Sequence, residues 1–131
     1  MKKMIVILLF SFLLCACNEQ GQKNSNVDGY KKSEINEEIP VPANAVASEL
    51  NFNNPNINNG IKYNLENIGG EQGLYPPLNY FEEMKKWGWE EVENERAGHA
   101  HFFRKGDTVI SIIVKEDYFK LYEMKETFEF N

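Results

Sequence analysis

The pattern of hydrophobic and polar positions predicts one helix, over residues 78–87. At 100° per residue, the large apolar side chains of this stretch fall on one side of the helix: Tyr80, Phe81, Met84 and Trp87. Charged residues occupy the other side. Two prolines precede the stretch and Gly88 follows it, which is the usual distribution of these residues around a helix. The apolar side is therefore expected to pack against the core.

Alternation of apolar and polar residues predicts four strands. The first covers residues 61–66, where the period of two is that of a half-buried strand. The other three follow the helix closely, over residues 99–104, 108–115 and 118–124. Gly106-Asp107 suits a two-residue hairpin turn between the first two of these strands, and Glu116-Asp117 suits the next turn.

The two turns predict a register for these three strands. The first turn sets three pairs on one face of the sheet: Phe103 with Ile110, His101 with Ile112, and His99 with Val114. The second turn adds three residues to that face: Phe119, Leu121 and Glu123. This is the more apolar face, and it is expected to receive the helix.

The opposite face of the predicted sheet is also rich in apolar residues. It carries Phe102, Val109, Ile113, Tyr118, Tyr122 and Met124. Such a face is too apolar to be only a solvated surface. Either the segments before and after the sheet cover it, or it binds a partner.

Another apolar run occupies residues 4–14, after Lys2 and Lys3. Its eleven residues suit the central part of a signal peptide and fall short of the roughly 18 that span a bilayer. The run ends in Leu14-Cys15-Ala16-Cys17, which resembles a bacterial lipoprotein signal, with leucine three residues before the last cysteine and a small residue directly before it. The resemblance implies cleavage after residue 16 and acylation of Cys17, so that the membrane is a partner through this lipid.

Two other interpretations of the same run remain open. A plain secretory signal cut after Ala16 would place Leu14 where a small residue is needed. An uncleaved anchor is the last alternative. If Cys17 is acylated, Cys15 leaves with the signal and no free thiol remains for a disulfide, thiol catalysis or a cysteine zinc site.

Composition divides the chain into three predicted regions: a signal peptide (1–16), a lipidated N-terminus with a disordered tether (17–38), and a folded domain (39–131). The tether is rich in polar residues and poor in large apolar ones. The formal charge of −6 becomes −8 once the two lysines of the signal are removed. An acidic surface disfavours nucleic acid and anionic lipid headgroups as partners.

His99 and His101 are the only histidines of the chain, and their spacing on a strand points both to one face. Two adjacent imidazoles form half of a metal site, which a carboxylate such as Glu123 would complete. The alternative is a pair of partly buried, hydrogen-bonded histidines without a metal. Metal or small-ligand binding is therefore a second functional hypothesis, and no resident cofactor is expected.

Acid–base catalysis is a third hypothesis, because an acidic run follows the helix: Glu90, Glu91, Glu93 and Glu95. Such a run is more typical of a solvated turn, and no catalytic triad accompanies it. The glycine-rich residues 69–77 lack the spacing of a phosphate-binding loop, and their prolines remove amide donors. We therefore expect that the protein is not an enzyme.

The folded region has further motifs: Pro40, Pro42 and Ala45 before the first strand, Trp87-Gly88-Trp89 at the helix end, and Phe102-Phe103 in a hairpin strand. With these, residues 40–124 are similar to small domains of bacterial lipoproteins and secreted proteins, a resemblance that implies no catalytic residues.

We predict an α+β domain, in the order β-α-β-β-β, with a single helix packed on a mainly antiparallel sheet of three to four strands. The leading functional hypothesis is an extracytoplasmic lipoprotein, anchored to the inner or outer membrane of a bacterium. Its domain would bind an envelope protein through Phe102, Tyr118 and Tyr122.

Overall fold

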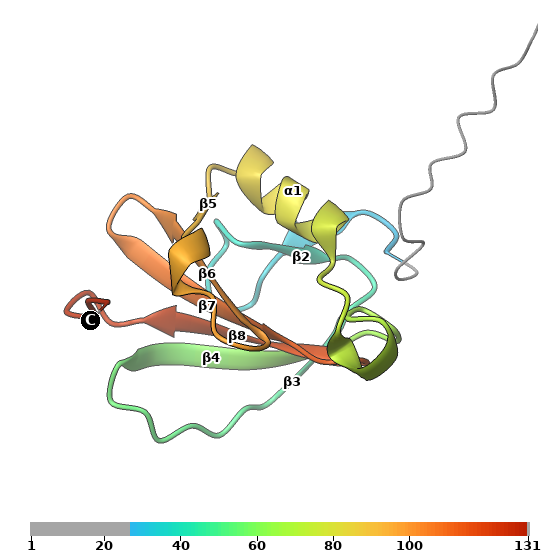
Figure 1. The fold of residues 1–131 in the computed structure, drawn as a ribbon, viewed down its shortest axis with the longest axis horizontal. Helices are drawn as coiled ribbons and strands as arrows, with labels where there is room; N and C mark the ends of the chain where they lie inside the picture. The colour runs from blue at the N-terminus through green and yellow to red at the C-terminus, as the bar shows by residue number, and fades with distance from the viewer. Residues whose placement is uncertain (1–26, 131) are drawn as a thin grey trace, which may run out of the picture.

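The computed structural model describes residues 27–130, and Figure 1 shows the helix α1 lying over a twisted sheet. Within these residues, eight strands form two antiparallel sheets: β1 (Tyr30–Lys32), β2 (Pro40–Pro42), β3 (Val46–Ser48), β4 (Ile57–Asn64), β5 (Glu90–Glu91), β6 (Ala100–Lys105), β7 (Thr108–Val114) and β8 (Tyr118–Met124). The helix α1 spans Leu78–Lys86, and two 3-10 turns are η1 (Glu71–Gly73) and η2 (Glu93–Glu95).

The predicted α+β fold, with one helix on three to four strands, is wrong. The described chain is mostly β, with a two-stranded sheet β1-β2 and a six-stranded sheet in the order β3-β4-β8-β7-β6-β5. The strands that the sequence did not predict have only two or three residues each. Such short strands show no measurable period, and β2 contains two prolines, which normally argue against a strand.

The register predicted for the last three strands is confirmed at the pairs that the structure forms. Phe103 lies opposite Ile110 and His101 opposite Ile112 in the β6–β7 pair. Phe119 pairs with Val114. His99 lies just before β6, and its carbonyl oxygen accepts a hydrogen bond from the Val114 amide at 3.1 Å. The two turns and the alternation were therefore sufficient to place this meander.

The predicted contact between the apolar side of the helix and the more apolar sheet face is also confirmed. Tyr80 and Phe81 are buried against Phe119 and Phe103, with ring centroids 5.4 and 5.1 Å apart. The small β1–β2 sheet completes this layer. The Tyr80 hydroxyl donates to the Pro40 carbonyl oxygen at 2.8 Å, which fixes β2 beside α1.

The folded region begins earlier than the sequence predicts, because β1 lies in the segment assigned to the tether. Its residues pair with β2, from Tyr30 opposite Pro42 to Lys32 opposite Pro40. Tyr63 also holds this segment, since its hydroxyl accepts the Glu34 amide at 2.9 Å. The pairing partners lie eight to twelve positions away in the sequence, so a local polar composition did not reveal them.

Other segments of the chain lie against the second face of the sheet. The ring of Phe102 is stacked on Phe128, with centroids 6.5 Å apart, and meets Phe130 edge-on at 5.2 Å. Phe52 meets Tyr122 edge-on at 6.1 Å. The tail and the loop before β4 thus bury much of this face.

The predicted signal peptide, Cys17 and the first part of the tether lie outside the described residues. In the part of the chain that the structure describes, no helix is long and apolar enough to cross a membrane.

Candidate functional site

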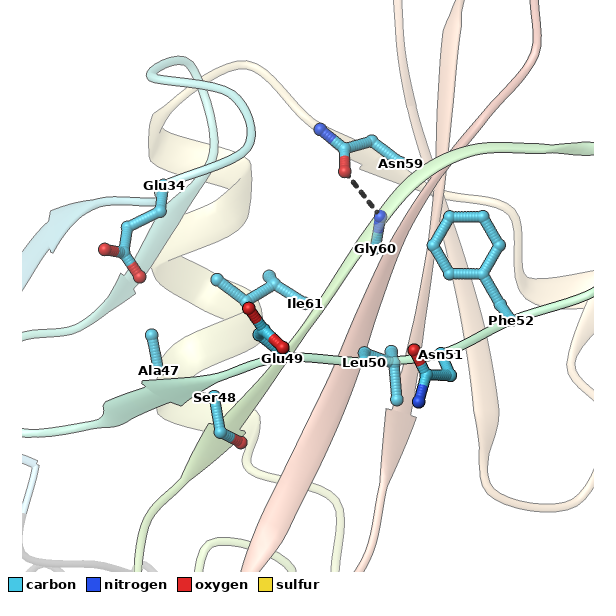
Figure 2. Close-up of a pocket in the computed structure, with 10 residues that line it drawn as sticks. All are labelled: Glu34, Ala47, Ser48, Glu49, Leu50, Asn51, Phe52, Asn59, Gly60 and Ile61. Atoms are coloured by element: carbon cyan, nitrogen blue, oxygen red, sulfur yellow. Dashed lines mark hydrogen bonds between the residues drawn. The ribbon is translucent and has the colours of Figure 1, made fainter.

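A groove of about 480 Å³ lies where β3 separates from β4 (Figure 2). The two strands pair only from Val46 opposite Asn64 to Ser48 opposite Lys62. Beyond Ser48 the chain leaves the edge of β4 and runs toward Phe52. The groove is lined by residues from both segments and from the loop after β1: Glu34, Ala47, Ser48, Glu49, Leu50, Asn51, Phe52, Asn59, Gly60 and Ile61.

The outer edge of β4 is open at this groove. The Leu65 amide donates to the Asp117 carbonyl oxygen, on the side of β8. Amide groups alternate in direction along a strand, so the Gly60 amide faces the other side, where β3 pairs with β4 further along. Its N–H donates at 2.9 Å to the side-chain oxygen of its neighbour Asn59, a bond drawn in Figure 2. No other described strand pairs with this edge at Gly60. An unpaired strand edge is a template for a further strand.

Beside the groove, the backbone of β4 is closely packed at Gly60. A Cβ added at Gly60 would lie 2.8 Å from the Tyr122 ring and 3.2 Å from the Phe52 ring. Glycine therefore allows the backbone of β4 to lie directly on these two rings. Leu50 and Ile61 also line the groove, Leu50 packing with the Tyr122 cluster and Ile61 with the main core on the other face of the sheet.

The charge of the groove is acidic. Glu34 and Glu49 are its two charged lining residues, and no basic residue lines it. Figure 2 shows Glu34 on the loop after β1 and Glu49 on the segment after β3. A ligand of this groove would thus combine apolar groups with positive charge.

The two histidines have different partners. His101 is buried, and its Nδ1 lies 3.2 Å from Oε1 of Glu91, whose carboxylate also accepts from Nη2 of Arg96 at 2.7 Å. Burial lowers the pKa of His101, and the Glu91 carboxylate opposes part of that effect. His99 instead lies 3.1 Å from the Gly73 carbonyl oxygen.

The carboxylate expected to complete a metal site is engaged elsewhere. Glu123 accepts from Asn36 at 2.9 Å and from Asn58 at 3.3 Å. Among the described residues, no group of three or more histidines, cysteines, aspartates or glutamates is arranged to hold a metal ion. The contacts of His99 and His101 are those of hydrogen-bonded structural residues.

The acidic run after α1 lines a second surface cavity of about 510 Å³, formed by Glu90, Glu91, Val92, Glu93, Asn94 and Arg104. The Glu91 carboxylate is buried and paired with His101 and Arg96. Glu93 is exposed and lies 4.0 Å from Arg96. The prediction of a solvated turn is therefore wrong for Glu91, whose buried carboxylate links β5 to His101 in β6.

The three residues predicted to bind a partner are contacted by the chain itself. Tyr122 is buried beside Phe52, and Phe102 lies against the two phenylalanines of the tail. Tyr118 is half-buried, with Nζ of Lys62 4.2 Å from its ring centroid. The groove beside Gly60 was missed because its only sequence signal is an asparagine-rich loop that ends in this glycine.

A comparison of the chain with protein-family models, with curated proteins and with solved structures found no match.

Proposed function

We propose that this protein is a lipid-anchored module outside the bacterial cytoplasm that binds an extended segment of an envelope protein. The open edge of β4 at the groove is the observation that carries the binding proposal. The segment Leu14-Cys15-Ala16-Cys17 supports the anchor. The second sheet face, through Phe102, Tyr118 and Tyr122, is not the surface we propose, because other parts of the chain lie on it.

In the proposed complex, the partner segment lies beside β4 as an additional strand. Main-chain hydrogen bonds would hold the two strands together. The Gly60 amide, which now donates to the Asn59 side chain, would donate to a carbonyl oxygen of the partner instead. Side chains alternate along such a segment. Apolar ones would face Leu50 and Ile61, and a lysine or arginine would lie near Glu34 and Glu49.

Site-specific photo-crosslinking in intact cells tests this proposal. A photoreactive residue at Asn51, which lines the groove, is expected to give an adduct of defined mass. The same residue at Asp107, in the exposed turn between β6 and β7, is the control and is expected to give none. Mass spectrometry of the adduct then identifies the peptide that occupies the groove.

A charge-reversal pair tests the chemistry of the groove. Glu49→Lys is expected to reduce the adduct at Asn51 severalfold, because the partner's basic side chain would meet a like charge. Glu66→Lys makes the same change of net charge at an exposed residue outside the groove and is expected to leave the adduct unchanged. The proposal fails if Asn51 gives no adduct, or if both variants give the same yield.

A further inference from the structure

Three of the five large hydrophobic side chains that are exposed in the described chain lie within one five-residue stretch. They are Leu74, Tyr75 and Leu78, with 63, 46 and 62% of their surface exposed. Glu71 is the one charged residue among residues 70–79. This stretch presents apolar surface without a charged residue of its own, and a charged contact lies close by, the Glu116 carboxylate at the Gln72 amide. We call it the apolar loop (residues 74–78).

The chain holds the base of this loop firmly. The Gly69 amide donates to the Glu116 carbonyl oxygen at 3.1 Å, and the Gln72 amide donates to the Glu116 carboxylate at 2.7 Å. His99 contacts the Gly73 carbonyl oxygen from the other side. Gln72 has a φ of 58°, which is unfavourable for a residue with a side chain. Such strain persists only where surrounding contacts impose it, and it is common at functional loops.

The apolar loop lies close to the point where the described chain begins. The rings of Tyr30 and Tyr80 are stacked with centroids 6.1 Å apart, so β1 starts beside the first turn of α1. Figure 1 shows the first described residues, in blue, at this end of the helix. Val27 is ten positions after Cys17, which sets an upper limit of about 36 Å on the distance between them.

We propose that Leu74, Tyr75 and Leu78 insert into the surface of the bilayer that holds the lipid on Cys17. This inference rests on the proposed lipid anchor. Leucine side chains bury well among acyl chains, and tyrosine favours the interface with the headgroups. The anchor keeps the loop at a high effective concentration near the bilayer, so a small apolar contact is sufficient to orient the domain.

Insertion of this loop directs the opposite end of the sheet away from the membrane. The apolar loop is held at the turn between β7 and β8, whereas Phe52 packs on Tyr122, near the other end of β8. The loop before β4 then faces outward, toward other envelope components. Because the contact is apolar, it is expected to be insensitive to salt and to need no anionic lipid.

Quenching by brominated lipid tests the inference. The mature chain, residues 17–131, is coupled through the Cys17 thiol to a maleimide lipid in phosphatidylcholine vesicles. Tyr75→Trp and Leu78→Trp each place an indole in the loop, and the emission of Trp87 and Trp89 in the unsubstituted chain is subtracted. Phe52→Trp is the matched control, since Phe52 is 37% exposed and lies at the far end of the sheet.

Brominated lipid is expected to quench most of the added emission of Tyr75→Trp and Leu78→Trp, at low and at high salt. It is expected to quench none of the added emission of Phe52→Trp. Equal quenching at all three positions, or none in the loop, overturns the inference. Chemical coupling supplies the anchor here, so this result is independent of acylation in cells. Failure of the anchor proposal would appear separately, as an unacylated Cys17 in protein isolated from cells.

Discussion

Replacing Phe81 with alanine removes a buried side chain that packs α1 against β6 of the large sheet. Phe81 is 4% exposed, and its ring lies 4.8 Å from the ring of His101 and 5.1 Å from that of Phe103, between centroids. Truncation of a buried phenylalanine costs about 3–5 kcal/mol, because transfer free energy is lost and a cavity remains. That range already includes aromatic contacts, which are worth about 0.5–1.5 kcal/mol each, and the two contacts of Phe81 place it away from the lower limit. We therefore predict a loss of about 4 kcal/mol in the free energy of unfolding.

Urea unfolding followed by tryptophan fluorescence measures this loss, since Trp89 is buried and reports on the core. Leu78→Ala is the control on the same helix. Its side chain is 62% exposed, so without membranes it is expected to cost about 0.5 kcal/mol or less. A loss below about 1 kcal/mol for Phe81→Ala, or equal losses for both variants, would refute the packing of α1 on β6.

Three further predictions concern stability. Burial lowers the pKa of His101 in the folded protein, so near pH 6.5 and just below it the unfolded chain binds more protons than the folded one. The free energy of unfolding should therefore fall as the pH decreases through 6.5. His101→Gln should reduce this dependence of the unfolding free energy on pH, measured by urea titrations. Gly69→Ala places a Cβ against the Lys115 carbonyl oxygen and should cost about 1–3 kcal/mol by thermal unfolding, with an unchanged melting temperature as the contradicting result. Phe128→Ala should cost about 1 kcal/mol in urea, whereas exposed Glu129→Ala should cost nothing measurable; equal effects would mean that the tail does not cover the second face.

Local sequence signals were sufficient for α1 and for the meander of β6, β7 and β8. The apolar stripe of the helix and the Gly106-Asp107 turn act over a few residues, so periodicity and turn chemistry determine them. The strand before the helix was also expected, although it covers Ile57–Asn64 and begins before the predicted residue 61. After Ile57, its early residues are two asparagines and a glycine, which have low strand propensity.

Non-local pairing explains what the sequence did not reveal. Strands β1 and β5 form because their backbones pair with distant segments, Tyr30 opposite Pro42 and Glu90 opposite Arg104. No local sequence pattern indicates those pairing partners. The groove depends on the point at which the chain leaves β4 after Ser48. The spacing of the two histidines predicted the same environment for both side chains. In the structure only His101 lies within a strand, where its Nδ1 contacts the Glu91 carboxylate.

The proposed anchor is tested most directly by intact-mass and peptide mass spectrometry of the protein isolated from cell membranes. The account predicts an N-terminal peptide that begins at Cys17, lacks residues 1–16 and carries the added mass of a diacylglyceryl group on sulfur, with further mass if the amine is also acylated. A peptide that still begins at Met1, or a Cys17 with a free thiol, would contradict it.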